Sequence, residues 1–468
     1  MRCLQENVLF LALAVSVVCS VCGAGESKAI LRLQSGTESY ADGPMPPHIR
    51  VQATELDGPV FTDASGHTLY VWQQRELRNG YAGDPKGSAS NCGNTKETTN
   101  AGLMSPYPAG LLLPELEKRP SCAQLWPPLL ARTDAKPVGK WTLIPRKDGA
   151  TQWAYDGQPV YTSALDRKPG DAFGGSSRIG GFDGPVVRHP VGPPPDVPPG
   201  LAVHTVNRGR MLTTAEGTWP VYYSEHDSPD RSNCDDECTK TWKPVLAGEF
   251  AHPHGDWSVI KRAPGVFQWA FRKAPLYTYV FERHPHGQTG SDVPGWHNVF
   301  TQLAPLPPRS FTVQDTTAGE VLGDPHGKTI YTFGCGDDAA DQLSCDHPDT
   351  VQLYREAMCG GGDPVRCQKN FPYVIAQAGE SGSSRSWSVV LIDAATGHFA
   401  APGTPGALRV WAYRDRPVYT YAGDEQPGDI NADSHGEFRG ERDGYKAFWL
   451  RDDFFQQYRE NLLTTLRR

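Results

Sequence analysis

The pattern of apolar and polar positions along the chain predicts short β-strands joined by many turns. Apolar and polar residues alternate in TQWAY from Thr151 and in PVYTS from Pro159, which is typical of half-buried strands. In PVFTDASGHTLYVW from Pro59, two apolar runs flank a glycine turn, which indicates a β-hairpin. Glycine (49 residues) and proline (41 residues) are abundant, as a turn-rich chain requires. These patterns predict an all-β protein.

The same pattern occurs three times in succession. Each copy contains a glycine turn just before a tyrosine, and later a tryptophan followed eight residues on by a second tyrosine. An acid follows the second tyrosine at the fifth position, giving the pairs Tyr161 and Asp166, Tyr277 and Glu282, and Tyr419 and Asp424. We therefore predict three tandem β-modules of six or seven short strands each, over residues 44–190, 191–303 and 304–451. Separate beads, packing around a pseudo-threefold axis and a six-bladed propeller all agree with this pattern, and we favour packed modules.

The two ends of the chain differ from the repeats. Residues 1–24 combine Arg2, a short apolar run and small residues, as a secretory signal peptide does, and residues 25–43 follow as a linker. The residues before Cys22 do not support a lipid anchor, and no later segment is apolar enough to span a membrane. In residues 452–468 the apolar positions recur with helical spacing, which predicts a C-terminal amphipathic helix.

Cysteine usage agrees with export. Three of the 11 cysteines lie in the signal region, and the remaining eight are an even number, as four disulfides require. The repeat places an upstream cysteine before a Cys-x₃-aromatic element in each copy, which predicts the pairs Cys92–Cys122, Cys234–Cys238 and Cys359–Cys367. Cys335 and Cys345 remain for the fourth disulfide, and they belong to an insertion in the third copy.

Charge argues against nucleic acid as a partner. The net charge is −8, and no basic stripe interrupts the sequence. We therefore predict an extracytoplasmic protein, either periplasmic or secreted. Its partner is an unknown envelope protein or a small ligand.

The repeats resemble a family of bacterial secreted repeat proteins, which are predicted lipoproteins with a Tyr-x-aromatic-x-x-Asp motif. CAQLWPPL from Cys122 and DGATQWAYDGQPVY from Asp148 carry the resemblance, and Tyr222 with Asp227 repeats the motif. The chain departs from it at Glu282, and at Tyr70 and Tyr331, where no acid stands at the fifth position. The resemblance implies export and an envelope location, and it implies no established activity.

Two interpretations of the repeated tyrosine and acid compete. A carboxylate could bind a cation or ligand, or it could accept backbone N–H groups and fix the turn at a strand end. Because a fold-determining residue recurs in every module, we favour the structural interpretation. The acidic turns DRKPGD from Asp166 and DEQPGD from Asp424 offer oxygens for calcium, although their spacing matches no calcium loop. The tryptophans at strand spacing indicate core positions more than a stacking platform.

Histidines gather in the second module. The HPHG motif occurs twice, at His252 and His254 and at His284 and His286. Imidazoles spaced in this way bind copper or zinc, so these four residues are candidate metal ligands. A turn at the surface is the alternative.

Catalytic motifs are absent from the sequence: it contains no nucleophile elbow, metalloprotease helix, phosphate loop or haem attachment site, and no motif requires a cofactor. The leading hypothesis is a non-enzymatic envelope protein that binds a ligand or serves as a scaffold. A periplasmic metal-binding or electron-transfer accessory protein is one alternative. An envelope hydrolase with carboxylates from different modules is the other.

Overall fold

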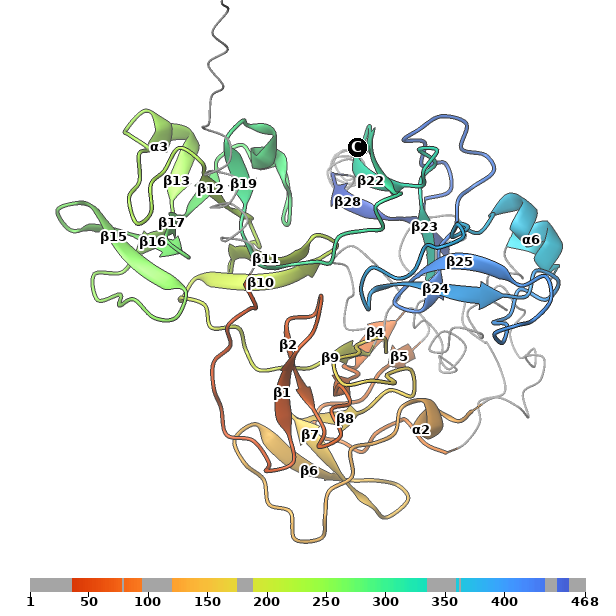
Figure 1. Ribbon diagram of the computed structural model, residues 1–468. Coiled ribbons are helices and arrows are strands. Elements are labelled where there is room, and N and C mark those ends of the chain that lie inside the picture. Colours follow the sequence, from red (N-terminus) through yellow and green to blue (C-terminus); the bar gives the residue numbers. More distant parts are fainter. Residues whose placement is uncertain are drawn as a thin grey trace, which may run out of the picture.

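The computed structural model describes residues 36–77, 80–94, 120–174, 188–334, 359–361, 363–433 and 444–453 (Figure 1). Short strands dominate these segments, and their pairings within the sheets are antiparallel. The prediction of an all-β protein is confirmed. Every named sheet takes its strands from one of three successive parts of the chain, and each part forms one lobe in Figure 1. We call these parts groups 1, 2 and 3.

Group 1 contains a two-stranded sheet (β1–β2), a five-stranded sheet in the order β6-β7-β8-β3-β9, and the hairpin β4–β5. Its elements are β1 Arg50–Ala53, β2 Pro59–Thr62, β3 Tyr70–Val71, β4 Arg75–Leu77, β5 Gly80–Ala82, α2 Cys122–Leu125, β6 Trp141–Pro145, β7 Thr151–Tyr155, β8 Gln158–Tyr161 and β9 His189–Pro190.

Group 2 contains the sheets β10-β11-β20 and β13-β18-β12-β19, and the sheet β14-β16-β15 with β17 paired to β16. Its elements are β10 Leu201–Val206, β11 Gly209–Thr214, β12 Val221–Ser224, α3 Cys238–Thr241, β13 Trp242–Pro244, β14 Leu246–Ala247, β15 Trp257–Ala263, β16 Val266–Phe271, β17 Ala274–Pro275, β18 Tyr277–Tyr279, the 3₁₀-helix η2 Thr289–Asp292, β19 Trp296–Asn298 and β20 Phe300–Leu303.

Group 3 contains the sheets β21-β22-β28, β23-β27 and β24-β25-β26. Its elements are β21 Thr312–Thr316, β22 Gly319–Gly323, β23 Tyr331–Gly334, α6 Pro364–Asn370, β24 Trp387–Ile392, β25 Leu408–Tyr413, β26 Arg416–Pro417, β27 Gly444–Ala447 and β28 Trp449–Asp452.

The three groups repeat one hairpin with the same register. In each, an aliphatic residue of one strand faces the repeated tryptophan of the next: Leu143 faces Trp153, Val259 faces Trp269, and Val389 faces Trp411. The next turn has positive φ angles at both central residues, 48° at Asp156 and 79° at Gly157 in group 1. Such a turn matches the twist of paired strands.

The strands of this hairpin are more buried than their alternating pattern predicts. Gln152 is 1% exposed although it is polar. Its side-chain amide nitrogen donates to the carbonyl of Val160 at 2.8 Å, and its amide oxygen accepts from Arg146 at 2.8 Å. The prediction of a half-buried strand was therefore wrong at this position, because hydrogen bonding satisfies a polar side chain that faces the interior.

Each group has its own apolar interior. Trp153, Trp269 and Trp411 are 2%, 5% and 3% exposed, and each belongs to the hydrophobic cluster of its group. These tryptophans are core residues, as their fixed spacing indicated.

The turn between β1 and β2 connects group 1 with both other groups. The carbonyl of Thr54 accepts from the side chain of Gln302 in group 2 at 2.7 Å. The carboxylate of Glu55 accepts from the backbone nitrogen of Ser386 in group 3 at 2.8 Å, and Leu56 packs within a hydrophobic cluster of group 3. The groups are thus packed against one another.

Several predictions about the ends of the chain fall largely outside the described residues. These are the signal peptide at 1–24, most of the linker at 25–43 and the helix at 452–468, of which Asp452 ends β28. The module boundaries stay a prediction. Within the described residues, no helix has the length and apolar character needed to cross a membrane.

Candidate functional site

The repeated tyrosine and acid form hydrogen bonds between the two halves of each group. The hydroxyl of Tyr70 on β3 donates to Asp166, which follows β8, at 2.8 Å. Tyr331 donates to Asp424 at the same distance in group 3, and Tyr222 donates to Glu282 in group 2. Each acid therefore accepts from the first tyrosine of its group and not from the tyrosine five residues before it.

In groups 1 and 2 the second tyrosine makes the reciprocal contact. Tyr277 donates to Asp227, an acid of the first half of group 2, at 2.7 Å. Tyr161 donates to Asp84 in group 1. Sequence reasoning missed Asp84 because it lies beyond the hairpin β4–β5, outside the five-residue spacing. The two tyrosines of a group are also register partners, as for Tyr70 and Tyr161.

Burial governs the electrostatics of these pairs. Asp166 is 5% exposed, and loss of water raises its pKa from 3.8 to about 7. Burial also raises the pKa of Asp84, Asp227 and Asp424. Asp166 accepts the backbone N–H of Phe173 at 2.8 Å besides the hydroxyl of Tyr70. These contacts connect the loop after β8 with β3.

In both acidic turns the last carboxylate accepts backbone N–H groups of its own turn, and the other oxygen of Asp171 also lies 3.4 Å from Arg385 of group 3. One carboxylate oxygen of Asp171 accepts the backbone N–H groups of Arg167 and Lys168 at 3.0 and 2.8 Å. Asp429 does the same for Glu425 and Gln426, at 2.9 Å each. Among the residues that the structure describes, no group of three or more histidine, cysteine or acidic side chains is placed to hold a metal ion.

The two HPHG pairs lie in different surroundings, and within the described residues no site brings three of these four histidines together. His252 is exposed, and His254 lies 3.6 Å from a carboxylate oxygen of Asp196. His284 is buried and lies 3.4 Å from Asp453 of group 3.

His286 contacts a histidine that the sequence did not single out. Its ring centre lies 4.6 Å from that of His204. Burial, with the neighbouring imidazoles His204 and His284, lowers the pKa of His286 to about 4. A neutral ring at this position is therefore favoured over most of the pH range.

Three of the proposed cysteine pairs lie at disulfide distance. The Cα atoms are 5.2 Å apart in Cys92–Cys122, 5.2 Å in Cys234–Cys238 and 4.7 Å in Cys359–Cys367. Cys335 and Cys345 lie outside the described residues.

A pocket of about 510 Å³ opens between groups 2 and 3, beside the segment that connects them. Trp387, Tyr413, Phe448 and Leu450 of group 3 contribute apolar surface to its lining. Pockets of this size at the interface of two packed units are the usual place for a small ligand. The pocket is therefore the candidate functional site.

Charged residues line the same pocket and are already paired. Arg208, in the turn between β10 and β11, donates to Glu320 of β22. Arg451 of β28 binds Asp292 of η2 through both terminal nitrogens, with one contact at 2.8 Å. Both pairs join group 2 to group 3, so the polar lining also holds the two groups together.

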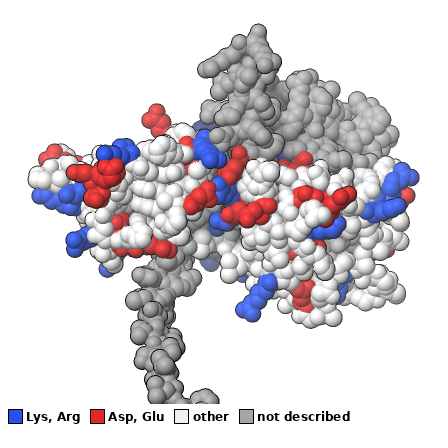
Figure 2. All heavy atoms as spheres, turned by 90° about the horizontal axis from the view of Figure 1, so that it is seen from above, with Lys and Arg blue, Asp and Glu red and all other residues white. Residues whose placement is uncertain are grey.

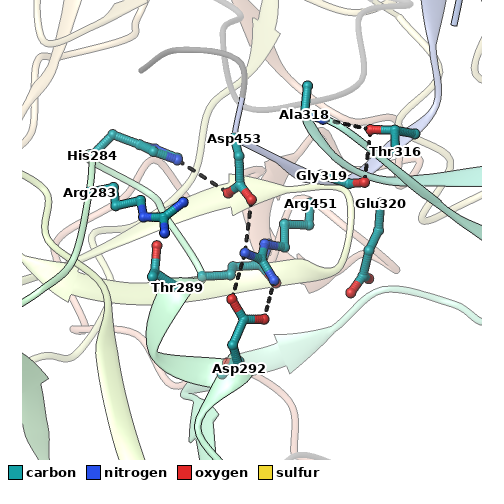
Figure 3. A network of polar contacts seen from close by, with 12 residues as sticks. Arg283, His284, Thr289, Asp292, Thr316, Ala318, Gly319, Glu320, Arg451 and Asp453 are labelled. Atoms are coloured by element: carbon teal, nitrogen blue, oxygen red, sulfur yellow. Dashed lines mark hydrogen bonds and ion pairs between the residues drawn. The ribbon is translucent and has the colours of Figure 1, made fainter. Parts of the chain in front are cut away.

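Arg451 belongs to a chain of contacts that extends to His284 (Figure 3). Arg451 lies 2.8 Å from one oxygen of Asp453, and His284 lies 3.4 Å from the other. Burial alone would raise the pKa of Asp453, but hydrogen bonds from His284 and Arg451 outweigh it and lower that pKa. For His284, burial would lower the pKa, but the contacts with Asp453 and the Pro285 carbonyl raise it.

Sequence reasoning named few residues of this site. Of the candidate metal ligands, His284 joins the chain of contacts beside the pocket, and His297 of the same histidine-rich module lines the pocket itself. The arginines and acids of the lining were missed, because they lie on separate strands and share no spacing. The outer surface offers no stronger signal, since acidic and basic side chains intermingle over the face shown in Figure 2.

Comparison with known proteins gives one match. Residues 142–175 and 202–246 match a family model that describes a secreted repeat of unknown function. The first region covers the second half of group 1, and the second covers the first half of group 2, so the matched unit is about half a group. No curated protein and no solved structure matches the chain. Two regions of the chain are thus similar to a secreted repeat whose function is unknown, and these regions include Asp166 and Asp227, the acids that accept from Tyr70 and Tyr277.

Proposed function

We propose that the protein is a non-enzymatic envelope protein that binds a small ligand in the pocket between groups 2 and 3, with the repeats as its scaffold. The observation that carries this proposal is the pocket itself, which two packed groups and their connecting segment line. The match to a secreted repeat family supports an extracytoplasmic location.

The aromatic lining supports a preformed site. Trp387, Tyr413 and Phe448 contact one another, with ring centres 4.9, 5.2 and 5.1 Å apart in the three pairs. All three side chains are buried in the core of group 3. Rings packed in this way lose little freedom when a ligand binds, so less of the binding energy is lost to ordering.

The proposal predicts that filling the pocket abolishes binding. Ala304 lines the pocket, and Ala304→Trp would occupy it, whereas Ala215→Trp places the same side chain at an exposed turn. The mature protein is mixed with a small-molecule extract of bacterial envelopes, separated by size exclusion and examined by native mass spectrometry. We expect one bound compound per chain in the parent and in Ala215→Trp, and none in Ala304→Trp.

Two results would count against the proposal. The first is that no compound is retained by the parent protein. The second is that Ala304→Trp retains it equally well. If the compound is recovered in a hydrolysed form, the hydrolase alternative is supported in place of simple binding.

A further inference from the structure

We propose that the ligand of this pocket is an uncharged, mainly apolar small molecule. The inference rests on the proposed function, and it adds the chemical class of the ligand. It follows from three features of the pocket: its paired charges, its apolar wall and its rim.

The charges of the lining cancel within the protein. Arg208 is paired with Glu320, and Arg451 with Asp292. The histidine of the lining, His297, contacts Glu225 at 2.7 Å. A charged ligand would have to compete with one of these contacts, and it would exchange water for a wall that offers it no net counter-charge.

The guanidinium of Arg451 is particularly well held. Its side chain is 14% exposed, and its terminal nitrogens contact Asp292 and Asp453. The bonds to both carboxylates raise the pKa of Arg451 above its ordinary value. Arg451 therefore serves the contact between the groups, and an anionic ligand gains little from it.

The apolar surface continues from the buried wall to the solvent. Inside are Trp387 and Phe448, which are 1% and 2% exposed. Toward the solvent, the lining includes Leu303, Leu306 and Val313, which are 36%, 82% and 57% exposed. A ligand that covers these side chains removes apolar area from water, which is the main favourable contribution to binding.

The dimensions favour a small molecule over a macromolecule. A volume of about 510 Å³ lies within the range of about 300 to 1,000 Å³ that is usual for pockets that enclose small ligands. The connecting segment Ala304–Pro307 forms part of the lining, so the pocket is bounded by chain on this side.

Two fluorescent probes with the same ring system test the charge preference. N-phenyl-1-naphthylamine is uncharged, and 8-anilinonaphthalene-1-sulfonate adds a sulfonate to it. The mature full chain is titrated with each probe at low salt. We expect saturable binding of the neutral probe at one site per chain, and affinity for the anionic probe lower by about tenfold or more.

Substitutions that place a charge at the rim of the pocket test where the probe binds. Leu306→Asp and Val313→Asp each place a carboxylate beside the pocket, and we expect each to weaken binding of the neutral probe by about tenfold. Phe250→Asp is the matched control, since Phe250 is 85% exposed in group 2 and is not part of the lining. Near-ultraviolet circular dichroism and the thermal midpoint must match the parent for each variant.

The outcomes separate the ligand class from the site. If the anionic probe binds as tightly as the neutral one and the rim variants weaken both, the pocket binds ligands but the proposed class is wrong. If no probe binds, or if the rim variants leave the affinity for the probes unchanged, the ligand class and the proposed function are both wrong. A bound apolar peptide that displaces the neutral probe more effectively than any small molecule would also overturn the inference.

Discussion

The tyrosine–carboxylate pairs inside the groups and the ion-pair chain between groups 2 and 3 use polar side chains in opposite ways. The pairs recur at equivalent positions, as in Tyr70 with Asp166 and Tyr331 with Asp424. The chain from His284 to Arg451 occurs once among the described residues and joins two groups. A polar contact that recurs in every repeat builds the fold, whereas one that departs from the repeat is available for a particular task.

The loop that follows the repeated acid differs between the groups. In groups 1 and 3 the turn after the acid ends with Asp171 and Asp429, whose carboxylates accept backbone N–H groups of the turn. In group 2 the equivalent position is Gly287, and the turn contains His284. The group 2 loop thus lacks the carboxylate that accepts its own N–H groups, and it contacts group 3 through His284, whereas the group 1 loop contacts group 3 through Asp171, which lies 3.4 Å from Arg385.

The largest expected effect is on the repeated pairs. Tyr70→Phe removes the hydroxyl that donates to the buried Asp166, and we expect it to lower the free energy of unfolding by about 2 kcal/mol. The loss should be greatest above pH 7, because the pKa of Asp166 is about 7 and its ionised form depends most on donors. Urea unfolding at pH 8 measures it.

Tyr155→Phe is the matched control, since Tyr155 is a half-buried tyrosine of the same group. We expect it to change the free energy of unfolding by less than about 0.5 kcal/mol. Equal losses in the two variants would show that the hydrogen bond to Asp166 makes no specific contribution to the free energy of unfolding.

A smaller effect is expected between the groups. Arg451→Met keeps an apolar stem but removes the guanidinium that contacts Asp453 and Asp292, and we expect a loss of about 1 to 2 kcal/mol in the free energy of unfolding. Hydrogen exchange should increase in η2 and β28 while the hairpin of Trp153 in group 1 stays protected. Uniform loss of protection would contradict a local role for Arg451.

The pair Arg132 and Asp134 provides the control for this variant. Both side chains are highly exposed, at 84% and 73%. Arg132→Met should leave stability unchanged within measurement, because exposed ion pairs contribute little.

The smallest expected effect concerns pH. Contacts with Asp453 and Pro285 raise the pKa of His284, so the folded chain holds this proton more tightly than the unfolded chain does. The resulting stability is fully present below the ordinary pKa of 6.5 and is lost as pH rises through the higher folded value.

His284→Gln should remove this dependence and about 1 kcal/mol of stability at pH 6. The thermal midpoints of parent and variant should therefore differ at pH 6 and converge at pH 9. A constant difference between them would assign His284 a packing role, with no contribution from its charge.

The sequence by itself determined the features that local chemistry and repetition encode. Strand-forming runs, glycine turns and the recurrent tryptophans gave the all-β class and the core positions, and the repeated cysteines gave three pairs that lie at disulfide distance. These predictions succeed because the conformation of a strand, a turn or a short loop depends mainly on neighbouring residues.

Only the tertiary structure decided which acid each tyrosine meets and where the pocket lies. Tyr70 and Asp166 are 96 residues apart, and the repeated spacing of Tyr161 and Asp166 gave no indication that the hydrogen bond crosses between the halves of a group. Arg451 and Asp292 lie 159 residues apart, and no repeat marks them. Their contact exists because two groups pack together, and packing between distant strands leaves no periodic signal in the chain.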